Sequence, residues 1–411
     1  MNVTLNSPLF KEVIVAPPSK SEAHRALICA SLARAATFIP CAVTNNDIEA
    51  TAGCLRALGA NIEKRSDGYY VEPIKEIPQF TECDCGESGT TLRFMIPLCA
   101  AFGCKTTLTL HGRLPERPLS PLDTVLAGKG VSVTKHANTV TVSGSLPKND
   151  DWSIAGNVSS QFISGMLFAL TVVGGTLTVT EKTESRPYIE MTCGIINGCG
   201  GSITEINGKY TVSSAYPLNC QESVYVGGDW SGAAFPLVIG AVGKRSVTVK
   251  GLDISSAQGD KAIIAVLKKM GAEIEQNGTA FTAHPSKLYG CTVDCADIPD
   301  LVPVLAVAAL RADVKTEFIN AARLRLKESD RISATAAMIR ALGGKVEEKP
   351  DGLTVYKSDL TGGKVNSEND HRIAMSAAAA ACFASGKVEI TDAQCVNKSY
   401  PAFWEEFEAL I

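Results

Sequence analysis

Six strongly apolar segments recur along the chain, and each begins at a small or acidic polar residue. The openings are 67, 72, 71, 69 and 70 residues apart and are Ser21, Ser88, Ser160, Ser231, Asp300 and Asp370. Such residues suit helix N-termini, where their side-chain oxygens accept hydrogen bonds from free backbone amides. The segments are apolar nearly all round, so the pattern predicts six buried helices rather than amphipathic surface helices.

A second periodic signal is a glycine that follows a helical stretch and precedes a strand. These glycines are 71, 70, 71 and 72 residues apart and are Gly59, Gly130, Gly200, Gly271 and Gly343. A glycine after the last helical residue typically adopts a positive φ, which predicts five helix ends. A short hairpin should follow each, as in Ser202–Glu205 and Tyr210–Val212 around Asn207-Gly208.

A third signal is a β-rich segment after each apolar helix. These segments are Thr106–Leu110, Thr176–Thr180, Ser246–Lys250, Thr316–Ile319, Val388–Thr391 and, more weakly, Thr37–Val43. Together the signals predict an α/β fold built from six βαβαββ repeats of about 70 residues each. Pro97 and Pro236 fall inside two of the apolar helices, where they should produce kinks.

The sixth repeat is incomplete, because the chain stops at Ile411 after a predicted helix over Phe403–Leu410. We expect the segments Val3–Leu5 and Val13–Val15 to supply its missing strands. This assigns residues 18–226 to one domain of three repeats, and residues 1–17 with 227–411 to a second. Pro17-Pro18 and Gly227-Gly228 lie at the two crossings and are the predicted hinge.

The composition is that of a globular protein too long for one core, with 45% hydrophobic and 20% charged residues among 411. A net charge of −4 argues against non-specific nucleic-acid binding. Residues 1–20 lack the pattern of a secretory signal, and no apolar run is long enough to span a bilayer. We therefore expect a cytoplasmic protein. The fourteen cysteines include one CxC and no paired CxxC sets, which predicts free, mostly buried thiols and no metal site.

Basic residues concentrate where the apolar helices begin. A helix N-terminus carries partial positive charge and free N–H donors, so several of them together would bind anions. The basic residues in these loops are Lys20, Arg25, Arg93, Arg117, Arg186, Arg323, Arg325, Lys327, Arg331, Arg372 and Lys398. Each taken singly could be a solvated surface charge. Their repeated placement predicts negatively charged substrates bearing phosphate or carboxylate groups.

A few other polar residues in these loops allow two interpretations each. Asp300 is either a helix N-cap or a general base beside bound substrate. Glu328 either forms an ion pair with Arg331 or transfers a proton, and His371 could simply cap a helix. Ser159-Ser160-Gln161 could cap a helix or bind a phosphate. The residue pattern alone leaves these alternatives open.

Ten linked motifs resemble the 5-enolpyruvylshikimate-3-phosphate synthase family, in order and from about Ala16 to Phe403. They are Lys20-Ser21 with Arg25, Gly89-Thr90 with Arg93, Arg117-Pro118, Ser159-Ser160-Gln161, Ser185 with Pro187-Tyr188, Gly228-Asp229-Trp230-Ser231, Ile298-Pro299-Asp300, Lys327-Glu328-Ser329-Asp330-Arg331, Asn369-Asp370-His371-Arg372 and Lys398. Any one is weak, but the ordered set is specific.

The resemblance implies an inside-out α/β barrel fold with two domains that close around substrates bound in the cleft between them. It implies transfer of the enolpyruvyl group of phosphoenolpyruvate to the 5-hydroxyl of shikimate 3-phosphate, a step in chorismate and aromatic amino acid biosynthesis. The reaction passes through a tetrahedral ketal phosphate and needs no metal or organic cofactor. A cytoplasmic monomer that is a target of glyphosate is the corresponding expectation.

The resemblance also assigns roles residue by residue. Shikimate 3-phosphate would be bound by Ser21, Arg25, Ser159, Ser160, Gln161, Ser185, Tyr188, Asp300 and Lys327. Phosphoenolpyruvate would be bound by Lys20, Gly89, Arg117, Gln161, Arg331, Arg372 and Lys398. Asp300 would accept the proton of the 5-hydroxyl, while Glu328 and Lys20 would serve the methylene carbon and the departing phosphate.

The sequence departs from the family pattern at Glu87, where many members have Asn, at Phe94, where many have Pro, and at Arg323-Leu324, where some have Asn-Trp. Retention of Gly89 favours a site open to glyphosate, whereas Glu87 near it opposes this. The nearest alternative is UDP-N-acetylglucosamine enolpyruvyl transferase. It is disfavoured by Lys20-Ser21 in place of Lys-Asn and by a loop, His111–Arg117, without cysteine. A non-catalytic anion-binding repeat protein is the other alternative.

Overall fold

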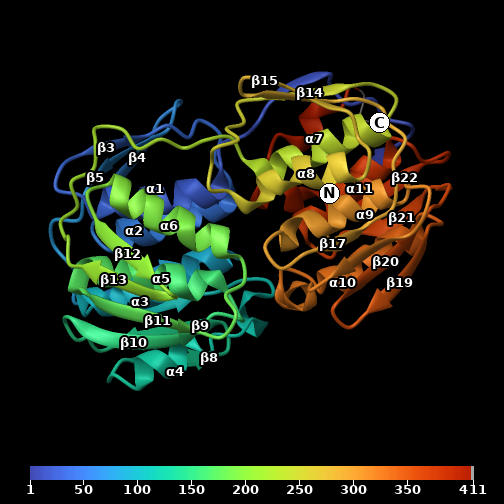
Figure 1. Cartoon of the computed structure of the whole chain (residues 1–411). Helices are drawn as coiled ribbons and strands as arrows, with labels where there is room; N and C mark the ends of the chain where they lie inside the picture. Colours follow the sequence, from blue (N-terminus) through green and yellow to red (C-terminus); the bar gives the residue numbers. More distant parts are fainter. Residues whose placement is uncertain (409–411) are drawn as a thin grey trace. The chain divides into compact units, whose positions relative to one another are not determined.

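A computed structural model describes residues 1–408, which fold into two compact units (Figure 1). Unit 1 consists of Met1–Pro17 and Gly227–Ile411, and unit 2 consists of Pro18–Val226. The chain therefore passes from one unit to the other twice. Each unit has its own hydrophobic core.

Unit 2 runs from blue to yellow-green in Figure 1. Its helices are α1 (Lys20–Ser31), α2 (Asn46–Ala57), α3 (Gly89–Phe102), the 3₁₀-helix η1 (Leu114–Glu116), α4 (Leu122–Ala127), α5 (Ser160–Val173) and α6 (Arg186–Gly198). Its strands are β3 (Thr37–Ile39), β4 (Asn61–Lys64), β5 (Tyr69–Glu72), β6 (Phe80–Asp84), β7 (Lys105–Thr109), β8 (Ser132–His136), β9 (Thr139–Ser143), β10 (Asp150–Ala155), β11 (Gly175–Thr180), β12 (Ser202–Ile206) and β13 (Lys209–Ser213).

The strands of unit 2 form three mixed sheets, ordered β6-β7-β9-β8, β10-β11-β13-β12 and β3-β5-β4. In both four-stranded sheets the first pair is parallel and the other two pairs are antiparallel. The three-stranded sheet has no such first strand. Instead, the end of the unit runs parallel to β3, where Phe38 N donates to Glu222 O at 2.8 Å and Val224 N donates to Phe38 O at 3.0 Å.

Unit 1 is coloured from yellow to red in Figure 1, apart from its blue first residues. Its helices are α7 (Trp230–Val242), η2 (Gly259–Ala262), α8 (Ile263–Lys269), η3 (Pro299–Leu301), α9 (Val302–Ala309), η4 (Ala322–Leu326), α10 (Arg331–Ala341), α11 (His371–Ala381), η5 (Ala393–Lys398) and η6 (Phe403–Glu406). Its strands are β1 (Val3–Leu5), β2 (Val13–Val15), β14 (Val247–Lys250), β15 (Ile274–Asn277), β16 (Ala280–Ala283), β17 (Thr292–Asp294), β18 (Thr316–Ile319), β19 (Lys345–Lys349), β20 (Gly352–Tyr356), β21 (Gly363–Asn366) and β22 (Val388–Thr391).

The three sheets of unit 1 are ordered β17-β18-β20-β19, β15-β16-β14-β2 and β1-β22-β21. β1 pairs antiparallel with β22, as expected for a strand that completes the last repeat. The expectation for Val13–Val15 was wrong, because β2 pairs in parallel with β14 in a different sheet. Between Gly227 and the start of α7 there is no strand, so the edge of β14 needs a partner for its backbone groups, and β2 supplies it.

The chain end also differs from the prediction. A helix was expected over Phe403–Leu410, but the structure has only the short η6, after which Phe407 bridges Phe10 antiparallel. The aromatic rings of Phe10 and Phe407 meet edge to face with centroids 5.0 Å apart. Pairing with the N-terminal segment thus replaces further helical turns. Leu410 lies outside the described residues.

The predicted glycine helix ends are confirmed by the backbone. Gly59, Gly130, Gly200, Gly271 and Gly343 all have positive φ, between 81° and 106°. The predicted hairpin around Asn207-Gly208 is also present, with φ of 53° and 79° at its two turn residues. The prediction of free, mostly buried thiols holds as well, since all fourteen cysteines are free and eleven are buried.

The apolar helices are buried as predicted. Every residue of α7, α9 and α11 is buried, and these three helices pack against one another in unit 1. Ser88 and Asp370 are N-caps, but α1, α5 and α7 are capped by Ser19, Ser159 and Asp229, close to the predicted openings. Across residues 1–408, no helix is long and apolar enough to cross a membrane.

Pro97 lies inside α3 and explains how closely α3 packs on α5. Proline has no N–H, so the carbonyl of Arg93, four residues earlier, loses its intrahelical partner. Gly165 of α5 lies against this carbonyl, and a Cβ on Gly165 would be 2.3 Å from the Arg93 oxygen. A glycine is therefore required at this contact between the two buried helices.

We predict that Gly165→Ala destabilises the protein by about 1–3 kcal/mol, because the backbone carbonyl of Arg93 cannot move aside without shifting α3. The matched control is Gly53→Ala in the middle of α2, where a Cβ would meet nothing within 4 Å. That control should stabilise the protein by about 0.5–1 kcal/mol through helix propensity. Denaturant unfolding measures both. Equal effects of the two substitutions would contradict the proposed packing role of Gly165.

Candidate active-site residues in the two units

Four helix N-termini of unit 2 carry the predicted binding residues. Lys20 and Ser21 are the first two residues of α1, and Gly89 is the first residue of α3. Ser159 caps α5, with its hydroxyl 3.3 Å from the amide of Gln161. Ser160 and Gln161 open α5, and Ser185 precedes α6 with a φ of 52°.

Arg25 connects α1 to α6. Its guanidinium donates to Thr192 Oγ1 at 2.7 Å, to Tyr188 O at 3.0 Å and to Ser21 O at 2.7 Å. The residue is only 2% exposed, and burial lowers the pKa of Arg25 to about 10, against the opposing effects of Tyr188 and Glu22. Arg25 therefore stays protonated at neutral pH, as a buried cation whose hydrogen bonds go to neutral oxygens.

A second group joins α3 to α5. Arg93 Nη1 donates to Gln161 Oε1 at 2.6 Å, and Gln161 Nε2 donates to Thr90 Oγ1 at 2.8 Å. A Cβ on Gly89 would be 2.6 Å from Arg117 Nη1 and 3.0 Å from Arg93 Nη1. The absence of a side chain at Gly89 thus lets two guanidinium groups approach the start of α3.

Lys20 is paired with an acid that the sequence analysis did not single out. Its Nζ lies 2.9 Å from Asp47 Oδ2, and both side chains are largely buried. Asp47 lies in the first turn of α2. An acid there looks like an ordinary helix-start residue, so only the packing of α1 beside α2 identifies it as the partner of Lys20.

In unit 1 the charged residues gather around Arg331, which is 1% exposed. Its guanidinium contacts Asp300 Oδ1 at 2.7 Å, Glu328 Oε2 at 2.6 Å and Asp370 Oδ2 at 2.8 Å. Burial opposes the charge, but Asp370, Glu328 and Asp300 raise the pKa of Arg331 above its ordinary value. We call Asp300, Lys327, Glu328, Arg331, Asp370 and Arg372 the Asp300 cluster.

Asp300 is surrounded by three cations within this cluster. Besides Arg331, Lys327 Nζ lies 3.2 Å from Asp300 Oδ1, and Arg372 Nη2 lies 3.4 Å from Asp300 Oδ2. Burial alone would raise the pKa of Asp300, but Lys327, Arg331 and Arg372 together hold it well below its ordinary value. The carboxylate is therefore ionised at neutral pH. Burial lowers the pKa of Lys327.

The structure decides some of the alternatives that the sequence left open. Asp300 is not a helix N-cap, since it lies within η3 and makes no capping hydrogen bond. Glu328 does form the ion pair with Arg331. His371 is the first residue of α11, and the N-cap of this helix is Asp370. Lys398 is not among the cations that contact the Asp300 carboxylate. Its Nζ donates to Asn369 O at 2.6 Å.

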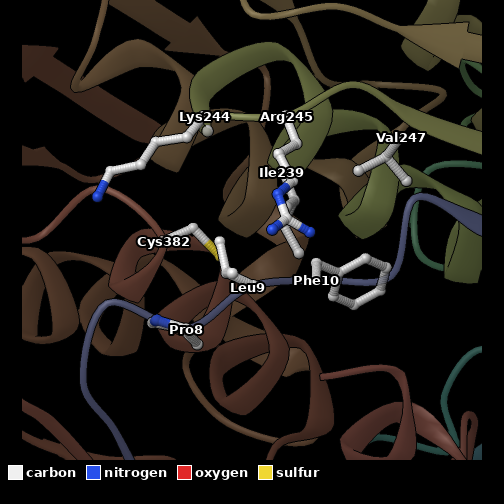
Figure 2. Close-up of a pocket in the computed structure, with 9 residues that line it drawn as sticks. Pro8, Leu9, Phe10, Ile239, Lys244, Arg245, Val247 and Cys382 are labelled. Atoms are coloured by element: carbon white, nitrogen blue, oxygen red, sulfur yellow. The ribbon is translucent and has the colours of Figure 1, made fainter. Parts of the chain in front are cut away.

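A small hollow elsewhere in unit 1 does not include these residues. Figure 2 shows it between Pro8–Phe10 and the end of α7, with Lys244, Arg245 and Cys382 at its lining. Arg245 is already paired there with Glu408 at 3.0 Å. In the part of the chain that the structure describes, no group of three His, Cys, Asp or Glu side chains could hold a metal ion.

Known proteins resemble this chain over nearly its whole length. Residues 3–407 match the family model of EPSP synthase (3-phosphoshikimate 1-carboxyvinyltransferase). A 3-phosphoshikimate 1-carboxyvinyltransferase of Clostridium kluyveri is 39% identical over 99% of this chain and 97% of that protein. One from Clostridioides difficile is 36% identical over 96% of this chain and 94% of that protein.

The chain belongs to the EPSP synthase family.

Solved structures share the fold. An EPSP synthase from Acinetobacter baumannii superimposes with a TM-score of 0.80 at 24% identity, covering 98% of this chain and 97% of that one. The enolpyruvyl transferase NikO from Streptomyces tendae gives a TM-score of 0.77 at 16% identity, covering 98% of this chain and 96% of that one. The predicted α/β class is confirmed by these likenesses, which at this level of identity concern the fold alone.

The structure shows what the residues at the three departures from the family pattern contact. The Arg25 guanidinium lies over the ring of Phe94, 5.1 Å from its centroid, so Phe94 supports a predicted binding residue. The Glu87 carboxylate lies against Gly112, where a Cβ would be 2.4 Å from Oε2. Arg323 donates to Ala296 O at 2.6 Å. Glu87 and Arg323 thus contact the loops that precede Arg117 and Asp300.

We predict that Asp300 contributes to stability at neutral pH and loses that contribution in acid. Its folded pKa is depressed, so the contribution is present above the unfolded pKa of about 3.9 and disappears as the pH falls below it. Asp300→Asn should therefore be less stable than wild type at pH 7, by about 1–3 kcal/mol, with the difference narrowing below about pH 4.

Urea unfolding at a series of pH values measures this difference. Asp359→Asn is the control, because Asp359 is an exposed aspartate of the same unit. A stability difference between wild type and Asp300→Asn that does not change with pH would show that the charge of Asp300 does not stabilise the fold.

Proposed function

We propose that the chain catalyses the reaction for which its family is named, transfer of the enolpyruvyl group of phosphoenolpyruvate to the 5-hydroxyl of shikimate 3-phosphate, with release of phosphate. Family membership over residues 3–407 supports the reaction. The observation in the structure that carries the proposal is the Asp300 cluster, in which one ionised carboxylate is surrounded by Lys327, Arg331 and Arg372. Such a carboxylate can act as a base while the cations bind anionic substrates.

Shikimate 3-phosphate is proposed to bind mainly to unit 2. Arg25 supports this assignment, because a buried guanidinium held by neutral oxygens keeps its full charge for a phosphate or another anion. The N-termini of α1, α5 and α6 add free N–H donors and hydroxyls. The proposed ligands are Ser21, Arg25, Ser159, Ser160, Gln161, Ser185 and Tyr188, joined by Asp300 and Lys327 of unit 1.

Phosphoenolpyruvate carries both a phosphate and a carboxylate, and it is proposed to bind the remaining cations. The start of α3 supports this, because Gly89 lets the Arg117 guanidinium approach the free amides of the first turn. The proposed ligands are Lys20, Gly89, Arg117, Gln161, Arg331, Arg372 and Lys398. Both ligand sets draw on both units, so we propose that catalysis requires the two units together, with the binding of shikimate 3-phosphate mainly in unit 2.

The proposed mechanism begins when Asp300 accepts the proton of the 5-hydroxyl as its oxygen attacks C2 of phosphoenolpyruvate. A proton added to C3 from Glu328 or Lys20 gives a tetrahedral ketal phosphate. Loss of a proton from C3 and departure of phosphate then restore the vinyl group. Anionic substrates on Lys327, Arg331 and Arg372 would offset the positive charge that holds the pKa of Asp300 low, and so make this carboxylate a stronger base.

The finer features of the fold are part of the same proposal. We propose that the chain is an inside-out α/β barrel of six βαβαββ repeats. The shared order of the four-stranded sheets β6-β7-β9-β8, β10-β11-β13-β12 and β17-β18-β20-β19 supports it. The remaining sheets fit if β1, β2 and the segment beside β3 supply missing strands. A cytoplasmic monomer that needs no cofactor completes the proposal.

Phosphate release from phosphoenolpyruvate by the purified protein tests the function. We expect release with shikimate 3-phosphate and none with UDP-N-acetylglucosamine, because the chain belongs to the family that uses the former. Release only with the sugar nucleotide would show that shikimate 3-phosphate is not the acceptor. No release with either acceptor would favour an anion-binding protein without catalysis.

Substitution of the proposed base tests the mechanism. Asp300→Asn should reduce kcat by about a hundredfold or more, because the amide cannot accept the hydroxyl proton. Binding of shikimate 3-phosphate, measured by calorimetry, should remain largely intact, since most of its proposed ligands lie in unit 2. Turnover close to that of the wild type would exclude Asp300 as the base.

A further inference from the structure

A short segment at the start of η2 is tied to the beginning of α7. Gln258 Nε2 donates to Gly228 O at 2.8 Å, and Gln258 Oε1 accepts from Trp230 N at 3.0 Å. Asp229, between those two residues, caps α7 by accepting from Ser231 N at 2.8 Å and Gly232 N at 3.1 Å. The first turn of α7 is therefore held by side chains from two directions.

Asp260 extends this connection toward the Asp300 cluster. Ser231 Oγ donates to Asp260 Oδ2. The backbone carbonyl of the same Ser231 accepts from Arg372 Nη1 at 3.1 Å, and Arg372 Nη2 lies 3.4 Å from Asp300 Oδ2. A continuous chain of contacts thus runs from Asp260 through Ser231 and Arg372 to the proposed base.

The surroundings of Asp260 make this an unusual place for a carboxylate. Asp260 is 1% exposed, and the charged groups that act on it include Asp300, Arg372 and Asp229. Burial, and then the charge of Asp300, raise the pKa of Asp260 to about 6, while Arg372 and Ser231 oppose the rise. A buried carboxyl group near another acid is energetically costly. Asp260 occupies this place in contact with Ser231, whose carbonyl accepts a hydrogen bond from Arg372.

We propose that Asp260 is a positioning residue for the reaction, which holds Ser231 so that the Ser231 carbonyl keeps the Arg372 guanidinium in place beside Asp300. The inference rests on the proposed function, in which Arg372 binds phosphoenolpyruvate. Arg372 is a long side chain with several rotatable bonds, and it must present its planar donor group in one orientation to bind an anion with two hydrogen bonds. Asp260 fixes one of the contacts of this guanidinium, which also reaches Asp300 and the ring of Phe235.

Steady-state kinetics of Asp260→Leu, with each substrate varied at a saturating concentration of the other, test the proposal. We expect the KM for phosphoenolpyruvate to rise about tenfold, because Arg372 loses its fixed orientation, while the KM for shikimate 3-phosphate changes by less than about threefold. Asp260→Asn should recover most of the loss, since its amide oxygen can accept the same hydrogen bond from Ser231. Ser231→Ala, which removes only the hydroxyl, should resemble Asp260→Leu and serves if the leucine variant does not fold.

Asp253 provides the matched control. It lies between β14 and η2, and its carboxylate also accepts a hydrogen bond from a serine hydroxyl, that of Ser255, at 2.7 Å. Asp253 is partly exposed, and its carboxylate contacts Ser255 rather than the series of contacts that leads to Arg372. Asp253→Leu should leave both KM values unchanged. An equal rise of the KM for phosphoenolpyruvate in the control would overturn the specific role of Asp260.

The double variant decides whether Asp260 acts through Arg372. Arg372→Gln by itself should raise the KM for phosphoenolpyruvate. Adding Asp260→Leu to that variant should raise this KM by no more than a further factor of about three, because the effects of residues that act through one another are not additive. Multiplicative effects would overturn the inference. An active wild type whose Arg372→Gln variant keeps its KM would overturn it as well, through its premise. A wild type without phosphate release would instead contradict the proposed function.

Discussion

The buried guanidinium of Arg331 is the interaction on which the charged cluster of unit 1 depends. A cation withdrawn from water is costly unless its charge and its N–H donors are satisfied. Arg331 meets this requirement with Asp300, Glu328 and Asp370 at 2.6–2.8 Å. The planar donor group of arginine can bind three carboxylates at once, which the ammonium of lysine could not do with the same geometry. Two of those carboxylates are the proposed proton-transfer groups, so the same contacts that allow the burial also set their positions.

The two units manage buried cations in different ways. In unit 1, Arg331 and Arg372 share the carboxylate of Asp300, and the cluster largely compensates its own charge. In unit 2, Arg25 donates to a hydroxyl and two backbone carbonyls, and we propose that its charge serves an anionic ligand. The difference fits a division of roles in which unit 2 provides attraction for an anion and unit 1 provides a carboxylate whose basicity responds to bound anions.

Much of the fold can be predicted from this sequence because its signals are local and repeated. Gly59 and Gly343 could be identified as helix ends, since positive φ after a helix is a property of the backbone at one residue. Burial of α7, α9 and α11 follows from composition, because a helix that is apolar on all sides must be covered. The assignment of Val13–Val15 was wrong because a three-residue strand says nothing about which open edge it will join. The helix over Phe403–Leu410 was replaced by pairing with Phe10, a partner almost 400 residues away in sequence.

For the candidate site, the sequence by itself determined the family, the helix starts and most of the charged residues, since these are ordered motifs. Only the tertiary structure decided which of these side chains contact one another. Asp300 could have been an N-cap, and only folding brings the three cations Lys327, Arg331 and Arg372 to its carboxylate. Asp47 and Asp260 carry no motif of their own, and they matter only because folding brings them to Lys20 and Ser231. The physical reason is that helix caps and turns are set by neighbouring residues in the chain, whereas the energy of a buried charge depends on every group that packs around it.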